Sequence, residues 1–493
     1  MAWDLDEYRR DAEAFLEEID REYYLQGAGH KPDLEIEPIY ERHEALFERE
    51  AVERIGEERR AARGEEGARL RYLHQFALDG HLGAATRALE ARLAALEASL
   101  EIEVDGEHIP YRMAPVEQAN EEDSERRAEI EAARNATLAE ALNPLHQEAL
   151  ETAHAACAEL GWPSYLDAYS DVRELDLRAL AEELDGFAEA TEPGYAAIVD
   201  PELERTVGIP LAELRRSDLV RFFRATHLDG LFPGERMVPA LTQTLAGLGI
   251  DLHAQSNVTL DTETRPTKSP RAFCAVPRVP DEIYLVISPV GGREDYEALF
   301  HEGGHTEHYA WTDPDLPFEF RHLGDNAVTE SYAFLMGGLT HDPQWLDSML
   351  GVESTDAAVE SARAVKLLFL RRYSAKLAYE VELHGPGADL EKMPERYASL
   401  LGERVGVEWP SETWLSDVDS GFYVGCYLRA WALEVDWRSA LRERFGEQWF
   451  ASAESGSWLR GLWARGQSLD ADRLLSEVAG RRLDFGALAA ELS

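Results

Sequence analysis

The chain has 493 residues, of which 45% are hydrophobic, so it can bury a large core without disulfides or a structural metal. It contains 95 acidic residues against 49 Lys and Arg, a net charge of −46 at pH 7. A surface of this sign repels phosphate and excludes nucleic acid as a general partner. Cys157, Cys274 and Cys426 are few and far apart, which excludes a disulfide framework and a zinc–thiolate cluster.

The chain begins MAWDLDEYRR, with acidic residues and no apolar run, which is not the pattern of a secretory signal. No stretch of about 18 uninterrupted apolar residues follows that could span a membrane. We therefore expect a soluble, cytoplasmic protein with no membrane partner. Its oligomeric state stays open.

Apolar residues recur at helical spacing in several long segments, which predicts a mainly-α protein. These segments are residues 12–26, 84–101, 239–248, 356–385 and 428–445. Strand signals are few: residues 100–112 alternate around Asp105-Gly106, the pattern of a hairpin, and the β-branched run 283–288 ends just before a Gly-Gly turn.

The segment FHEGGHTEHY contains the main chemical signal. His301 and His305 are four residues apart, so on a helix they share one face and can bind a single ion. Glu302 follows the first histidine, which completes the H-E-x-x-H pattern of a zinc site with an adjacent general base. The first turn of this helix is acidic, with Glu294 and Asp295, which suits the helix dipole, and Tyr296, Leu299 and Phe300 form an apolar stripe.

A third zinc ligand is needed, and two residues are candidates. His308 shares the face of His305, but it lies seven residues from His301, roughly 10 Å along a helix axis, so a structural or substrate-facing role suits it better. Glu330 lies in a segment that reads as a helix capped near Asp325, and its apolar neighbours call for a partner such as a metal. We predict that Glu330 is the third ligand.

Two glycines interrupt this helix, although each costs roughly 1 kcal/mol relative to alanine in a helix interior. We expect that Gly303 and Gly304 allow a second helix, which brings Glu330, to pass close to the first, or that they open the way to a substrate.

These residues resemble the family of zinc peptidases that includes thimet oligopeptidase and oligoendopeptidase F. The family core H-E-x-G-H-x-x-H is matched by His301, Glu302, Gly304, His305 and His308. Residues 271–305 are similar to the segment before the zinc helix in that family, and residues 461–492 to its closing segment. DGEHIPYR is similar to the angiotensin-converting enzyme branch of the same gluzincin superfamily.

The resemblance implies a mainly-α, two-lobed gluzincin metallopeptidase with a deep substrate channel and a small sheet beside the zinc helix. We expect residues 1–255 to form the helical lobe that covers the channel and residues 256–493 the catalytic lobe, as one continuous structural unit. It also implies an edge strand that pairs with the peptide. We assign this substrate-binding role to Ile283, Tyr284, Leu285 and Val286, with His308.

The tyrosine-rich segment of the family is only partly matched here, in DVDSGFYVGCYLRAW. Tyr427 is in register, which implies that it contacts the oxyanion, and Tyr423 is the second choice. Three further tyrosine positions and a histidine position hold other residues, namely Phe422, Cys426, Arg429 and Asp417.

These parts predict a zinc metalloendopeptidase that cuts short peptides, with one Zn²⁺ per chain and Glu302 as general base. Asp325 or Glu297 is expected to orient the histidines. The alternatives are a zinc carboxypeptidase or dipeptidyl carboxypeptidase of the same fold, and a non-catalytic peptide-binding homologue. A carboxypeptidase needs a cationic group for the substrate carboxylate, and four arginines are candidates: Arg271, Arg371, Arg372 and Arg429.

Overall fold

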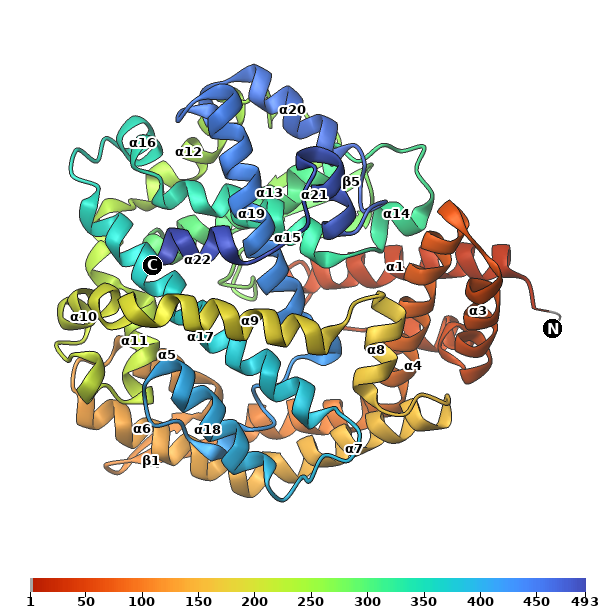
Figure 1. Ribbon diagram of the computed structural model, residues 1–493, viewed down its shortest axis with the longest axis horizontal. Coiled ribbons are helices and arrows are strands. Elements are labelled where there is room, and N and C mark those ends of the chain that lie inside the picture. The colour runs from red at the N-terminus through yellow and green to blue at the C-terminus, as the bar shows by residue number, and fades with distance from the viewer. Residues whose placement is uncertain (1–2) are drawn as a thin grey trace. The chain divides into compact units, whose positions relative to one another are not determined.

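Helices account for 70% of the protein, which confirms the mainly-α class. The computed structural model describes residues 3–493 (Figure 1). The helices, in chain order, are α1 Leu5–Gly27, α2 Glu37–Arg42, α3 Arg49–Ala61, α4 Gly64–Ser99, α5 Ala114–Asn120, α6 Ser124–Thr137, α7 Asn143–Glu159, α8 Tyr165–Arg173, α9 Leu177–Thr191, α10 Tyr195–Thr206, α11 Leu219–Arg224, α12 Gly234–Gly247, α13 Arg293–Ala310, α14 Phe318–His322, α15 Asn326–Gly338, α16 Pro343–Trp345, α17 Asp356–Leu383, α18 Met393–Val405, α19 Tyr423–Phe445, α20 Ala453–Trp463, α21 Ala471–Ala479 and α22 Gly486–Leu492. The strands are β1 Glu101–Val104, β2 Glu107–Pro110, β3 Val258–Asp261, β4 Phe273–Arg278 and β5 Glu282–Val286.

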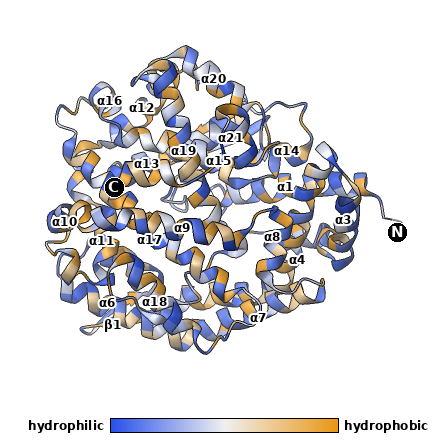
Figure 2. Cartoon of the chain, viewed as in Figure 1, coloured by the Kyte–Doolittle hydropathy of each residue, from blue (hydrophilic) through white to orange (hydrophobic). Residues whose placement is uncertain are grey.

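All five predicted helices are present, as α1, α4, α12, α17 and α19. α4 begins 20 residues earlier than expected. Its first half contains three glycines, which have a low helix propensity. Leu70, Leu73 and Leu78 are buried in the same half, and the free energy gained by their burial outweighs the cost of the glycines. Hydrophilic and hydrophobic residues are interspersed along the helices (Figure 2). None of the helices within residues 3–493 is both long and apolar enough to cross a bilayer.

The chain divides into two units, and each unit is assembled from three separate segments. The first comprises the segment up to Leu78 with Leu228–Val359 and Arg429–Ala487, and the second comprises Asp79–His227, Glu360–Leu428 and Leu488–Ser493. From the sequence we expected one division, near residue 255.

The first unit contains a mixed three-stranded sheet with the order β3-β5-β4. β3 is parallel to β5, and β4 is antiparallel to it, with Cys274 opposite Leu285. α1 covers one face, where the Tyr24 and Tyr284 rings stack with centroids 3.6 Å apart. α13 covers the other face, where Ile283 packs with Ala310.

This order corrects the expectation of an edge strand at residues 283–288. β5 is the central strand, and Ile283, Leu285 and Val286 are buried in the core, so its backbone is not open to a peptide. The outer strand on one side is β4. Its Pro277, next to a register shift, is typical of an edge, because proline cannot donate a ladder hydrogen bond.

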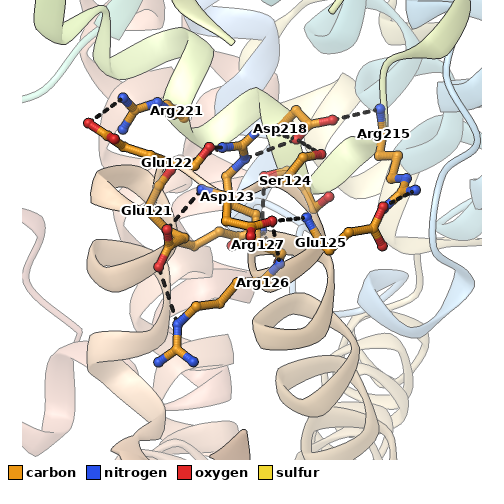
Figure 3. Close-up of polar contacts among 12 residues, drawn as sticks. Glu121, Glu122, Asp123, Ser124, Glu125, Arg126, Arg127, Arg215, Asp218 and Arg221 are labelled. Atoms are coloured by element: carbon orange, nitrogen blue, oxygen red, sulfur yellow. Dashed lines mark hydrogen bonds and ion pairs between the residues drawn. The ribbon is translucent and has the colours of Figure 1, made fainter. Parts of the chain in front are cut away.

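The second unit contains the predicted hairpin, in which β1 and β2 pair around Asp105-Gly106. It also contains a buried ion pair at the start of α6 (Figure 3). Arg127 Nε and Nη2 donate to Asp218 Oδ1 over 2.9 and 2.7 Å, and Arg127 Nη1 donates to the carbonyls of Glu121 and Glu122. A buried pair is tolerated only when it is hydrogen-bonded in this way, so the contact fixes residues 216–218 against α6.

Candidate metal centre

The helix α13 holds the H-E-x-x-H pattern, and its packing fixes which face carries the histidines. Asp295 in its first turn accepts a hydrogen bond from the Gly291 amide over 3.0 Å. Tyr296, Leu299 and Phe300 are fully buried, as the apolar stripe predicted. With that stripe in the core, His301 and His305 lie half-buried on another side of the helix.

Three side chains from two helices converge there. The Nε2 atoms of His301 and His305 lie 3.3 and 3.6 Å from Oε2 of Glu330, which is on α15. The three ligand atoms lie within 4.8 Å of one another, a spacing at which one ion could contact them all. Two imidazole nitrogens and one carboxylate form a donor set that suits catalytic zinc, which uses three protein ligands and leaves one position open.

The electrostatics of this group favour an ionised Glu330. Burial raises the pKa of Glu330, but hydrogen bonds and charge from the two histidines outweigh it and hold that pKa well below its usual range. Burial lowers the pKa of His305, and its contact with Glu330 outweighs this effect and raises it. The carboxylate is thus ionised, which a metal ligand requires.

The glycines of α13 are explained by the approach of α15. A Cβ at Gly304 would lie 2.6 Å from both the Cα of Ala333 and the carbonyl oxygen of Tyr332. No side chain fits at this distance, so glycine permits the contact that brings Glu330 to the histidines, as expected. At Gly303 a Cβ would lie 3.2 Å from Leu241 on α12, so this position also serves packing.

His308 belongs to the core and not to a substrate surface. It is fully buried, and burial lowers its pKa to about 3, so the ring is neutral. Its Nδ1 lies 3.1 Å from Thr329 Oγ1, and its Nε2 lies 3.4 Å from the Gly466 carbonyl. The substrate-binding role expected for His308 is therefore corrected to the structural alternative.

Thr329 orients His305. Its Oγ1 lies 2.8 Å from His305 Nδ1 and also contacts His308. Because His305 Nε2 faces Glu330, its Nδ1 donates to Thr329, whose hydroxyl donates in turn to Nδ1 of the neutral His308. His308 Nε2–H then points to the Gly466 carbonyl, so one chain of hydrogen bonds fixes the tautomer of both rings.

The two acids expected to orient the histidines have other partners. Asp325 caps α15 by accepting from the Ala327 amide, and it pairs with Arg429 Nη1 over 2.8 Å. Glu297 accepts from Arg293 Nη1 over 2.9 Å. Thr329 was not among the residues predicted from the sequence, although it directly precedes Glu330.

Glu302 is oriented by the sheet. Its Oε2 accepts a hydrogen bond of 2.9 Å from the backbone amide of Cys274 on β4. The carboxylate of Glu302, the predicted general base, therefore lies on the side of β4 that faces away from β5.

Tyr423 and Tyr427 lie half-buried on α19 in the second unit, with ring centroids 5.0 Å apart in a T-shaped contact. The metal cluster belongs to the first unit, so an oxyanion contact from either tyrosine stays a prediction. Asp417, which replaces the family histidine, accepts hydrogen bonds from Arg372 and Tyr397.

Of the four arginines considered for a substrate carboxylate, three make internal bonds. Arg371 is buried and donates to the Ala188 carbonyl, Arg372 donates to Asp417, and Arg429 pairs with Asp325. Arg271 is exposed.

No model of a known protein family matches the chain, and the search of curated proteins likewise finds no match.

Proposed function

We propose that the protein is a zinc-dependent endopeptidase that hydrolyses short peptides in the cytoplasm. The observation that supports this most is the convergence of His301, His305 and Glu330, with Glu302 beside them at a strand edge. A purely structural zinc site does not need an acidic residue beside its ligands, where Glu302 lies. None of the three cysteines forms a disulfide, which agrees with a reducing compartment.

His301, His305 and Glu330 would hold the ion, which in such a set would lower the pKa of water and polarise a carbonyl. Glu302 acts as general base and then as general acid: it takes a proton from the attacking water and gives it to the leaving amine. Its Oε2 is held by the Cys274 amide, so Oε1 is the oxygen available for that proton. Tyr427, or Tyr423, is the proposed donor to the oxyanion.

The substrate lies along β4 in this proposal, and not along β5. β4 is an outer strand whose Cys274 amide points toward Glu302, so a peptide added to that edge passes beside the general base. The internal bonds of Arg371, Arg372 and Arg429 favour an endopeptidase over a carboxypeptidase, because they occupy three of the candidate groups for a terminal carboxylate.

The test is hydrolysis of an internally quenched peptide of about ten residues, capped at both ends. We expect internal cleavage by the zinc-loaded protein, loss of cleavage after chelation and recovery when zinc is returned. Cleavage that persists without metal, or a zinc-loaded protein that cuts neither capped nor uncapped peptides, contradicts the proposal.

Replacing Thr329 with valine removes the hydroxyl between the two histidines and preserves the shape of the side chain. We expect zinc affinity to fall about 10–100-fold, the usual cost of losing a group that orients a ligand. Thr329→Ser, which keeps the hydroxyl, should bind zinc nearly as well as wild type. Competition with a fluorescent chelator measures both, and equal affinities for the valine and serine variants would show that Thr329 does not orient His305.

A further inference from the structure

α1 runs along the edge strand β4. A Cβ at Gly27 would lie 2.9 Å from the Phe273 ring, at the start of β4. Ten residues earlier, Glu17 Oε1 lies 3.8 Å from Arg278 Nε, at the end of β4. The helix and the strand are therefore antiparallel neighbours along the full length of the strand.

Asp20 lies on the side of α1 that faces this strand. It is one turn before Tyr24 and two turns before Gly27, which contact β5 and β4. Burial raises the pKa of Cys274 and of Tyr309, and the negative charge of Asp20 raises both further. Tyr309 is on α13, which covers the other face of the sheet.

This carboxylate has no partner to offset its burial. Within residues 3–493, no hydrogen bond or ion pair reaches Asp20, whereas its neighbours Glu17 and Arg21 pair with each other. Burial alone raises the pKa of Asp20 to about 6. A cationic ligand would supply the partner that this half-buried acid lacks.

We propose that Asp20 is a specificity-determining residue that binds a cationic group of a peptide paired with β4. The ligand chemistry is an ammonium or guanidinium, supplied by a Lys or Arg side chain or by a free peptide amino terminus. This inference rests on the proposed function, because it uses the same strand edge. The acidic surface of the whole chain adds a long-range attraction for such peptides.

The experiment measures binding of fluorescein-labelled decapeptides to the full-length protein by anisotropy, separately from any cleavage. One peptide has an acetylated end and a central lysine, the second has norleucine in its place, and the third has norleucine and a free amino terminus. We expect wild type to prefer at least one cationic peptide over the neutral one by about tenfold, as for a hydrogen bond to a charged group. In Asp20→Asn the preference should disappear while binding of the neutral peptide changes by less than about threefold.

Glu7→Gln is the matched control, because it removes the same charge from an exposed position on the same helix. Its cation preference should equal that of wild type. A wild-type protein with no cation preference, or an equal preference in Asp20→Asn, overturns the inference. If Asp20→Asn loses the preference for the lysine peptide, the cation comes from a side chain. If it loses the preference for the peptide with a free amino terminus, the cation is that terminus. If cation preference is found but no peptide is cut, Asp20 binds as proposed and the assignment as a peptidase fails.

Discussion

Glu302→Gln should retain zinc and lose hydrolysis. The three converging ligand atoms do not include Glu302, and glutamine can still accept the Cys274 amide hydrogen bond through its side-chain oxygen. What it cannot do is take a proton, and general-base catalysis contributes about 10²–10⁴-fold to a rate. We expect kcat to fall by that factor with one zinc per chain still bound, as measured with the quenched peptide and by metal analysis.

Glu294→Gln serves as the control for this change. Glu294 is exposed in the first turn of the same helix, and the substitution alters charge equally. Its kcat should remain within about threefold of wild type, because surface charges have small effects. Normal turnover by Glu302→Gln would remove this residue from the mechanism, whatever the control shows.

Gly304→Leu should separate the two helices of the metal centre. The new Cβ would lie 2.6 Å from the backbone of α15, and backbone cannot move aside as a flexible side chain can. Overpacking of this kind costs typically about 1–3 kcal/mol, and here the displaced helix also carries Glu330. We expect a lower midpoint of unfolding in urea and a loss of zinc affinity of at least about tenfold, since one of three ligands moves.

Gly461→Leu is the matched variant. Gly461 is an exposed helical position of the same unit, and a Cβ there has no heavy atom within 4 Å. Leucine favours helix over glycine by roughly 1 kcal/mol, so stability should rise slightly and zinc binding should not change. If Gly304→Leu binds zinc as tightly as Gly461→Leu, the close approach does not determine the ligand geometry.

Local geometry explains which parts of the site could be predicted from sequence. The spacing of His301 and His305 is a property of any α-helix, and an acid within an apolar helical segment signals a buried partner, which identified Glu330. Paired glycines in a helix have few uses other than close approach, and this expectation is confirmed at Gly304.

Long-range packing explains what was missed. The position of β5 in the sheet depends on two short segments, residues 258–261 and 273–278, that lack a clear alternating pattern. The role of Thr329 depends on how α15 packs on α13, because a threonine within a helix usually bonds its own backbone or faces water. Asp20 likewise resembles any acid on an amphipathic helix until α1 is seen beside β4.

The interleaving of the two units has a consequence for how the protein is made. In the first unit, Arg9 pairs with Glu319 across 310 residues of sequence, and Arg71 pairs with Asp470 across 399. A ribosome that adds about 5–20 residues per second needs roughly 20–80 s to synthesise the later partner of Arg71. During that time the amino-terminal helices are exposed without their core, so we expect the nascent chain to depend on chaperones, and neither unit to be obtainable as a contiguous fragment.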